Sequence, residues 1–224
     1  MGLTDSGQQT SAQAHARRVR EMFARISPRY DLLNHLLSAN IDRRWRRRVV
    51  RKLQSQLRSD AKILDVGCGT GDLSIELFEK TAAQVTGIDF CRPMLELAQA
   101  KAPHLRFVEG DALRLPFSDA TFDCVTVAFA LRNLASVKQG LAELNRVLRP
   151  DGTVAVLEFS QPTVPGFRQL VRFYYWRLLP WIGGLFSGSQ SAYEYLPDSI
   201  SRFPDQQALA AMMRAAGGRK PAPR

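Results

Sequence analysis

Cysteine is scarce in this sequence, long apolar runs are missing, and basic residues outnumber acidic ones. The three cysteines, Cys68, Cys91 and Cys124, show no Cys-x-x-Cys spacing, so a disulfide framework or a cysteine-bound metal has little support. No stretch approaches the roughly 20 consecutive apolar residues of a membrane-spanning helix. The polar N-terminal residues are unlike a secretory signal. These absences predict a reduced, cytoplasmic protein that needs no metal.

The excess of positive charge points to the kind of surface the protein meets. The chain has 31 Lys and Arg against 21 Asp and Glu, a formal net charge of +10. Much of it lies in the basic cluster, residues 43–52, RRWRRRVVRK. Such a cluster suits nucleic acid or an anionic membrane surface, and it is also typical of a solvated helix face. Trp45 favours the membrane surface, because indole prefers the membrane boundary.

Residues 62–72, KILDVGCGTGD, are the most informative stretch of the chain. A short apolar strand pattern runs into Gly67, Gly69 and Gly71, and a helical pattern follows at once. Alternate glycines allow a tight turn and leave room for a ligand beside the backbone. A glycine-rich turn at the start of an α/β unit binds nucleotide-like cofactors. Asp89, at the end of the next strand pattern, stands where a carboxylate would hold two ribose hydroxyls.

Asp72 bears on which nucleotide-like cofactor binds. The dinucleotide fingerprint G-x-G-x-x-G needs glycine at this position. A carboxylate facing the turn would repel a pyrophosphate, which favours S-adenosylmethionine over NAD. An NAD-dependent oxidoreductase and a plain tight turn without a ligand are the less favoured alternatives.

Strand and helix patterns alternate along the central part of the chain. They predict an α/β fold, a doubly wound, mostly parallel sheet with helices on both faces. We expect helices over residues 134–148 and 208–217. The predicted strands cover residues 62–67, 84–89, 105–109, 122–129 and 152–159.

Two further segments follow predicted strands and should face the same site, because ligands of open α/β sheets bind beyond the carboxyl ends of strands. In GDALRLPF (110–117), Asp111 and Ala112 could present a carboxylate and an amide to an adenine edge, although Gly-Asp is also common in plain turns. Arg132 and Asn133 end the strand pattern FDCVTVAFALRN.

The chain resembles the class I S-adenosylmethionine-dependent methyltransferases. The resemblance lies in four motifs and their order: DVGCGTGD, GIDF, GDALRLPF and LNRVLRPDGTVAVLEF. More narrowly, the chain resembles the ubiquinone/menaquinone biosynthesis C-methyltransferase family over roughly residues 15–217. The more specific stretches are residues 22–47, 128–133, 156–162 and 191–213. The resemblance implies methyl transfer to a ring carbon of a polyprenylated quinol, with demethylmenaquinol as the first choice and the ubiquinone precursor as the second.

Position in the motifs assigns roles to the candidate residues. Gly67, Gly69 and Thr70 should contact the methionine and ribose parts of the cofactor. Arg132 would stabilise a substrate phenolate or orient a water that takes the proton, since its own high pKa makes it a poor base. Arg132 and Asn133 could also be structural, because a strand-end Asn often caps the next helix.

The predicted organisation is one methyltransferase domain over residues 14–217. It consists of a helical cap (14–58), a cofactor-binding core (59–160) and a substrate lid with C-terminal helices (161–217). Residues 1–13 are predicted to be disordered and residues 218–224 to be irregular. In the family that the chain resembles, N-terminal helices cover the active site, so Tyr30 and His35, together with Tyr195, become candidates for the pocket wall.

Residues 166–188 are rich in aromatic and basic residues. They favour a lid that faces lipid and covers a long apolar tail, and part of them must be ordinary packing. We therefore expect peripheral association with an anionic membrane, and either a homo-oligomer or a quinone-biosynthesis complex.

The C-terminal end departs from the methyltransferase pattern. The predicted helix at 208–217 is followed only by GRKPAPR, so the last two strands of a class I fold are expected to be missing and the fifth strand to be an edge. This leaves open a non-catalytic, cofactor-binding subunit of a quinone-biosynthesis complex. A nucleic-acid methyltransferase is disfavoured, because residues 130–133 lack the Asn/Asp-Pro-Pro-aromatic turn.

Overall fold

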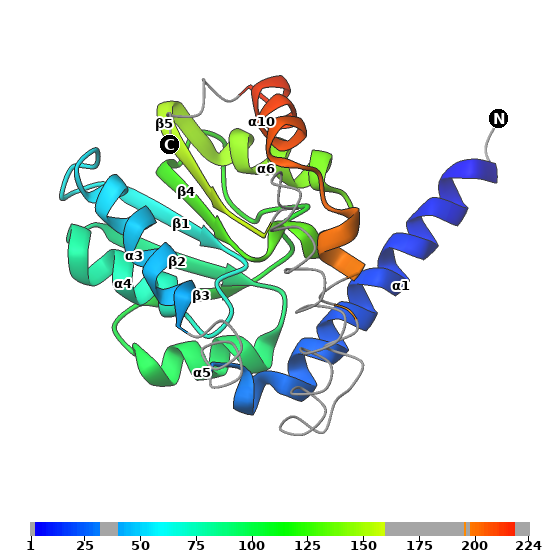
Figure 1. The fold of residues 1–224 in the computed structure, drawn as a ribbon, viewed down its shortest axis with the longest axis horizontal. Coiled ribbons are helices and arrows are strands. Elements are labelled where there is room, and N and C mark those ends of the chain that lie inside the picture. The colour runs from blue at the N-terminus through cyan, green and yellow to red at the C-terminus, as the bar shows by residue number, and fades with distance from the viewer. Residues whose placement is uncertain (1–2, 32–39, 160–194, 196–197, 218–224) are drawn as a thin grey trace, which may run out of the picture.

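The computed structural model describes residues 3–31, 40–159, 195 and 198–217. At its centre five parallel strands lie in the order β3-β2-β1-β4-β5, with helices on both faces (Figure 1). This confirms the predicted doubly wound sheet. Among the described residues, β3 and β5 are the two outer strands. The strands are β1 (Lys62–Val66), β2 (Gln84–Asp89), β3 (Arg106–Glu109), β4 (Phe122–Ala128) and β5 (Leu148–Leu157).

The strand order reverses between β1 and β4, and this positions the site. The chain moves outward from β1 through β2 to β3, then returns to place β4 on the other side of β1. The loops after β1 and β4 therefore leave the sheet in opposite directions and open a crevice at the carboxyl ends of these strands.

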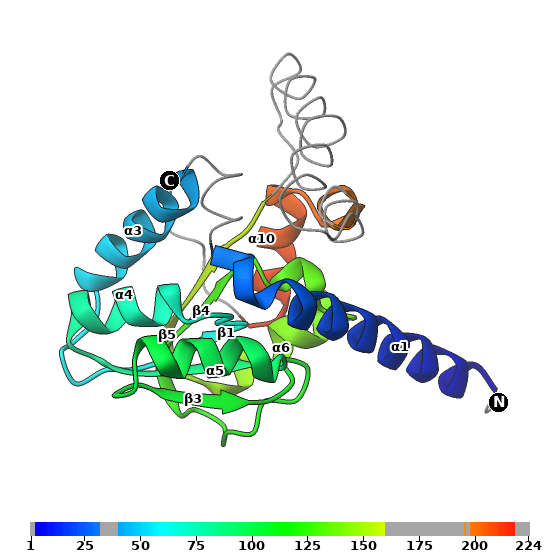
Figure 2. The same ribbon diagram turned by 90° about the horizontal axis from the view of Figure 1, so that it is seen from below.

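Three helices cover one face of the sheet (Figure 1, Figure 2). They are α3 (Ile41–Gln54), α4 (Asp72–Thr81) and α5 (Arg92–Lys101). Leu73 and Leu77 of α4 and Val50 of α3 are almost fully buried against Ile63 of β1. These apolar positions recur at helical spacing, which gives each helix one buried face.

Two helices cover the opposite face, α6 (Val137–Val147) and α10 (Gln206–Ala215). Leu141 and Leu144 of α6 are buried on the sheet, and α10 packs outside α6. Helix α6 begins later than residue 134, because Leu131–Asn133 forms a short 3-10 helix, η2, and Ser136 then caps α6 by accepting from Gln139 N.

Helix α1 extends over Leu3–Ile26, which includes most of the range 1–13 for which disorder was predicted, and the 3-10 helix η1 (Ser27–Arg29) follows it. The early residues include no proline and several good helix formers, so nothing interrupts a helix that starts in the packed part. Val19 anchors that part with 2% exposure. Helix α1 packs on α5, and its N-terminal end points away from the body in Figure 1.

Strand β5 begins at Leu148, earlier than the predicted residue 152. Leu148 pairs with Phe122, but the next pair joins Thr153 to Cys124, so the residues between them bulge out of register. Asp151 in this bulge has a left-handed backbone, with φ of 67°. An outer strand tolerates such a bulge and its proline, because one side needs no partner.

Several predicted features lie outside the described residues, namely His35, the aromatic segment 166–188 and the tail 218–224. In the parts of the chain that the structure does describe, no helix combines the length and the apolar character needed to cross a membrane.

A buried carboxylate joins the two halves of the sheet to helix α4. Asp65, at the end of β1, is 1% exposed and accepts hydrogen bonds from Ser74 Oγ at 2.6 Å and Thr126 Oγ1 at 2.7 Å. Burial nevertheless dominates and raises the pKa of Asp65 to about 6. The ionised form is therefore less stable in the folded chain than in the unfolded one.

We expect Asp65 to make stability depend on pH in a defined direction. The folded chain takes up the Asp65 proton near pH 6 and the unfolded chain only near pH 4, so this contribution is present at low pH and is lost as pH rises through about 6. Between these two pKa values the contribution of Asp65 to the free energy of unfolding changes by about 3 kcal/mol in total. Urea unfolding of the wild type and of Asp65→Asn, compared from pH 5 to pH 8, should show the wild type losing stability relative to the variant.

The matched control is Asp60→Asn, which removes an exposed carboxylate. Its stability curve should run parallel to that of the wild type. A constant difference between wild type and Asp65→Asn across this range would contradict the assignment.

Candidate active site

A pocket opens at the carboxyl ends of β1, β2 and β4, where the crevice was expected. Its walls come from the glycine loop (residues 67–71), the ends of β2 and β4, the loop after β3, and helix α1. Of the residues selected from the sequence, those that line it are Tyr30, Gly67, Gly69, Asp89, Asp111, Ala112 and Asn133. We refer to it as the cofactor pocket.

The glycine loop passes directly over the end of β4. Gly67 has φ of 66°, and a Cβ atom added there would collide with the Cβ of Ala130. Gly67 N and Cys68 N both donate to Ile88 O, at 2.8 and 3.1 Å, which fixes the loop to β2. The loop can therefore lie this close to both strands only because residue 67 has no side chain.

Asp89 presents a carboxylate of fixed orientation to the pocket. Oδ2 accepts from Gly69 N at 2.9 Å and Oδ1 from Cys91 N at 2.8 Å, and the residue is 8% exposed. Burial raises the pKa of Asp89, while these amides and the Arg20 guanidinium oppose the shift. Each oxygen keeps one further acceptor position, so the two together suit a pair of neighbouring hydroxyls.

The loop after β3 forms the opposite wall of the pocket. Asp111 Oδ1 accepts from Leu113 N at 2.8 Å, which closes a local turn and places Ala112 in the lining. Ile88 and Leu134 add apolar surface to the same pocket. A mostly apolar pocket with a few polar groups suits an adenine ring.

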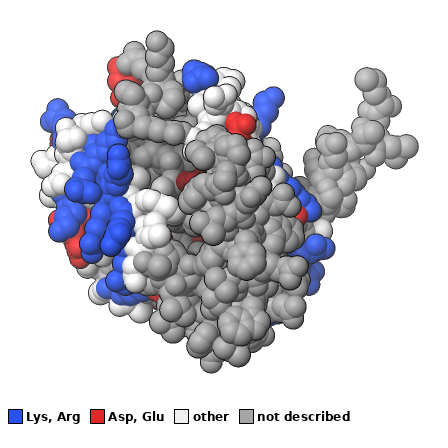
Figure 3. Space-filling model, in the orientation of Figure 1, with Lys and Arg blue, Asp and Glu red and all other residues white. Residues whose placement is uncertain are grey.

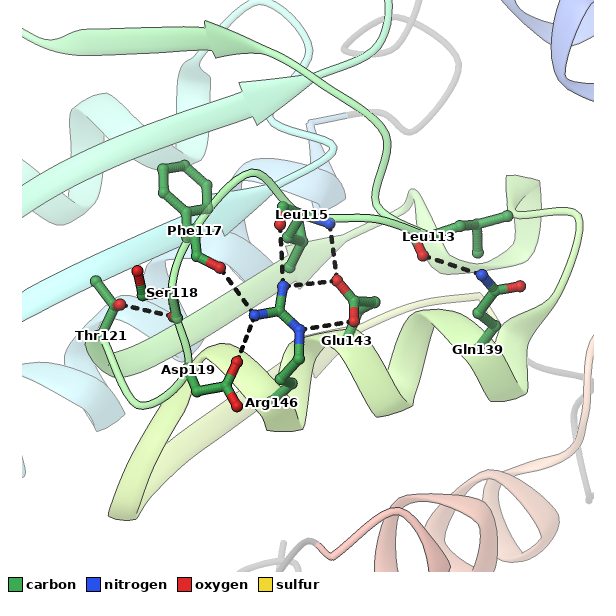
Figure 4. Close-up of polar contacts among 9 residues, drawn as sticks. All are labelled: Leu113, Leu115, Phe117, Ser118, Asp119, Thr121, Gln139, Glu143 and Arg146. Carbon is green, nitrogen blue, oxygen red and sulfur yellow. Dashed lines mark hydrogen bonds and ion pairs between the residues drawn. The ribbon is translucent and has the colours of Figure 1, made fainter.

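Helix α6 holds this loop from behind (Figure 4). Arg146 donates to Leu115 O at 2.9 Å, Phe117 O at 2.8 Å and Asp119 Oδ1 at 2.7 Å, and it forms two 2.8 Å bonds to Glu143. Glu143 in turn accepts from Leu115 N at 2.8 Å. All five N–H donors of the Arg146 guanidinium have an acceptor, so this one side chain holds several points of the loop in place.

Sequence reasoning did not identify Arg146 and Glu143. Their loop partners come earlier in the chain, about one strand and one helix before them. A basic and an acidic residue that bind backbone groups show no distinctive spacing in the sequence. Only the folded loop brings the acceptors together.

A second, more polar pocket adjoins the first on the other side of the glycine loop, and Asp65 is part of its lining. Thr70 Oγ1 donates to Asp31 Oδ1 at 2.5 Å, so Thr70 faces this polar pocket. Asp72 accepts from Arg46 at 3.0 Å and from Lys101 at 2.9 Å. The predicted repulsion of a pyrophosphate by Asp72 is therefore weakened, because two cations compensate its charge.

Arg132, which the sequence predicts on the substrate side, is not among the described residues that line the cofactor pocket. Its guanidinium forms a buried ion pair with Glu158, donates to Phe129 O at 2.7 Å and lies over the Phe159 ring. The two side chains are only 8% and 2% exposed. This arrangement positions the turn after β4, and it leaves the Arg132 charge balanced by Glu158.

Asn133 does line the pocket, and two distant elements hold it. Its Oδ1 accepts from the Tyr195 hydroxyl at 3.1 Å, and its backbone oxygen lies 3.3 Å from His15 Nε2. Burial raises the pKa of Tyr195, so its hydroxyl remains a donor. The two predicted residues Asn133 and Tyr195 are thus in direct contact.

Aromatic residues from several elements complete the cofactor pocket. Phe23 of α1 packs edge-on against Tyr30, with ring centroids 5.8 Å apart, and both line the cavity together with Phe90 and Phe129. Arg20, also from α1, lies over the Phe90 ring. The sequence suggested only that N-terminal helices cover the site. The individual residues depend on how α1 crosses it.

Burial disfavours the thiolate form of all three cysteines. Burial raises the pKa of Cys124 to about 12 and that of Cys68 well above its usual range, so both remain thiols at neutral pH. Within the described ranges there is no group of three or more His, Cys, Asp or Glu side chains that could bind a metal ion.

Comparison with known proteins agrees with this geometry. The model of the ubiE/COQ5 methyltransferase family matches residues 11–221 of the chain. The chain is 50% identical over 206 residues to the demethylmenaquinone methyltransferase of Deinococcus radiodurans, covering 90% of this chain and 85% of that protein. It is 46% identical to the ubiquinone/menaquinone biosynthesis C-methyltransferase UbiE of Citrifermentans bemidjiense, covering 89% and 87%.

Solved structures agree at the level of the fold. A SAM-dependent methyltransferase from Thermotoga maritima superposes with a TM-score of 0.60 at 19% identity, over 88% of this chain and 80% of that one. At such identity the likeness concerns the arrangement of helices and strands.

Arg146→Gln should weaken S-adenosylmethionine binding by about tenfold, equivalent to about 1.4 kcal/mol, because the loop that carries Asp111 and Ala112 loses its anchor. Adenosine alone should lose affinity by a similar factor, whereas kcat at saturating cofactor should stay close to the wild-type value. Isothermal titration and steady-state kinetics measure these quantities.

Arg149→Gln is the matched control, since Arg149 lies just beyond α6 in strand β5 and, among the described residues, forms its ion pair with Asp123. It should leave both affinities unchanged. Equal cofactor affinity in the two variants, or a loss of kcat without a change in affinity, would argue against a positioning role for Arg146.

Proposed function

The chain belongs to the ubiE/COQ5 methyltransferase family, and from this we propose that it transfers the methyl group of S-adenosylmethionine to a ring carbon of a polyprenylated quinol. Demethylmenaquinol is the proposed substrate, since a demethylmenaquinone methyltransferase is 50% identical over 90% of the chain. The ubiquinone precursor is the second candidate. The observation that carries the proposal is the fixed, buried Asp89 carboxylate at the wall of a mostly apolar pocket.

The described residues fit S-adenosylmethionine at three points. Asp89 offers two acceptors to the ribose hydroxyls, and Asp111 with Ala112 meets the edge of the adenine. Gly67 and Gly69 leave the backbone open toward the methionine part, on the side of the polar pocket. When bound, the sulfonium group supplies an electrophilic methyl for transfer to carbon.

The chain's own contribution to the chemistry is positioning and the exclusion of water. We assign Asn133 to orient the ring hydroxyl that loses its proton, because it is a polar group of the turn after β4 that lines the pocket. Tyr195 fixes the Asn133 amide through its hydroxyl. Arg132 acts on the site through its own turn, held by Glu158, rather than by contact with the substrate.

The aromatic lining supports a quinol ring as the acceptor. Phe23, Tyr30 and Phe129 lie around the pocket and come from α1, the segment after it and the end of β4. Such surfaces stack on a fused naphthoquinol or a substituted benzoquinol. His35 and the aromatic lid segment at 166–188 remain predictions for the same wall and for the isoprenoid tail.

We also propose that the protein works on the cytoplasmic side of an anionic membrane, where such substrates reside. The basic charge and the lipophilic substrate of the relatives support this location. Association with further copies of the chain or with other quinone-biosynthesis proteins stays a prediction, and no observation favours nucleic acid as a partner.

The proposal is tested by methyl transfer from labelled S-adenosylmethionine to short-tailed demethylmenaquinol and, in parallel, to the ubiquinone precursor. We expect label in the first product, and the ratio of kcat/KM values identifies the preferred ring. Cofactor binding without transfer to either quinol would overturn the enzymatic proposal and support the non-catalytic subunit.

Asp89→Asn should reduce the affinity for S-adenosylmethionine by about a hundredfold or more, because it removes a charged acceptor of two hydroxyls. Isothermal titration gives the affinity, and thermal unfolding reports whether the variant is folded. Asp60→Asn, which changes an exposed carboxylate in the same way, should bind as the wild type does. Unchanged affinity in Asp89→Asn would refute the ribose assignment.

A further inference from the structure

The structure divides the basic cluster on α3 into an inner and an outer part. Arg46 points inward, is 11% exposed at its side chain and pairs with Asp42 and Asp72, both at 3.0 Å. Arg44, Arg47 and Arg48 are exposed on the outer side. In the part of the chain that the structure describes, none of these three has a carboxylate partner within ion-pair distance. Of these four arginines, Arg46 is therefore the one whose charge is balanced by carboxylates within the fold.

The outer arginines surround a concave site between α3 and α4. Arg44, Arg47, Arg48 and Arg51 of α3 and Lys80 of α4 line this basic groove, which encloses about 530 Å³. Glu76 is the single acidic residue in its lining. Figure 3 shows the Lys and Arg side chains gathered into one patch over α3. Converging cations around a hollow form a site for polyvalent anions such as phosphate groups.

Apolar side chains accompany the charge. Ile41 and Trp45 are among the few exposed large hydrophobic residues, at 41% and 39% exposure, and both belong to α3. Trp45 also lines the basic groove. An exposed indole beside arginines is the composition of a membrane-interface helix, in which the ring enters the headgroup layer while the guanidinium groups meet phosphates.

The Trp45 ring also connects the groove to the cofactor pocket. Its centroid lies 5.7 Å from that of Phe159 and 6.4 Å from that of Phe129. Phe129 lines the cofactor pocket itself. A surface that engages the α3 groove therefore lies next to the site where the quinol ring must enter.

We propose that the basic groove of α3 and α4 binds the phosphate groups of anionic phospholipids at a bilayer surface, with Ile41 and Trp45 in the interface. This deepens the proposed function and rests on it for its purpose, because a polyprenylated substrate is delivered from the bilayer. The combination of exposed isoleucine and indole with the arginines favours a bilayer over a nucleic acid, which offers phosphates without an apolar layer.

The test is co-sedimentation of the full chain with phosphatidylcholine vesicles, with and without phosphatidylglycerol. Wild-type protein should bind the anionic vesicles. The triple variant Arg44→Gln, Arg47→Gln, Arg48→Gln should lose on the order of a hundredfold in affinity, since each basic residue near an anionic surface contributes about fivefold. Trp45→Ser should weaken binding by a smaller factor.

A matched triple variant, Arg58→Gln, Arg92→Gln, Arg106→Gln, lowers the net charge by the same amount at exposed sites elsewhere. It should retain most of the binding. An equal loss of vesicle affinity in both triple variants would overturn the proposed groove site, because net charge alone would then explain the binding. Absence of wild-type binding to anionic vesicles, or tight binding of a single-stranded oligonucleotide that vesicles do not displace, would overturn it as well.

Methyl transfer to a short-tailed quinol in solution separates the two proposals. If the groove variants lose vesicle binding but wild-type protein methylates no quinol, the docking surface stands and the substrate assignment fails. If wild-type protein methylates the soluble quinol and does not bind anionic vesicles, the function stands and the docking surface fails.

Discussion

The close passage of the glycine loop over the end of β4 is the constraint on which the rest of this site depends. Gly67 lies against Ala130 in a left-handed conformation that leaves no space for a side chain. This contact brings the ends of β1, β2 and β4 together, so that Gly69 N reaches the Asp89 carboxylate. The glycine loop can therefore present its backbone, without side chains at residues 67 and 69, to the pocket.

The groups that face the pocket are held in place by hydrogen bonds from other parts of the fold. Backbone amides fix the Asp89 carboxylate, Arg146 fixes the loop that carries Ala112, and Tyr195 fixes Asn133. Such support keeps functional groups in place before a ligand arrives and reduces the entropy that binding must overcome. Several of these supporting residues lie on α6 or near the C-terminal helices, far from the glycine loop in the chain.

Local pattern predicted the parallel sheet, its strand positions to within a few residues, and a carboxylate at residue 89 that lines the pocket. These features follow from strand and turn chemistry that a short window contains. The start of β5 was misplaced because a bulge at Asp151 is stabilised by pairing with β4, which no local window shows. Arg132 was assigned to the substrate side because strand ends face the crevice, and its ion pair with the buried Glu158 depends on a residue 26 positions further on, which no local window shows.

The sequence by itself determined the class of the fold, the glycine loop and the nucleotide-like cofactor, since glycine spacing and apolar periodicity act over a few residues. Only the tertiary structure decided which arginines are structural and which are exposed, because neighbouring residues on a helix point in different directions. Arg46 and Arg47 are adjacent in the sequence, yet one is paired with acids and the other lines an open groove. Burial and partners across the fold, which a linear pattern does not contain, separate the two.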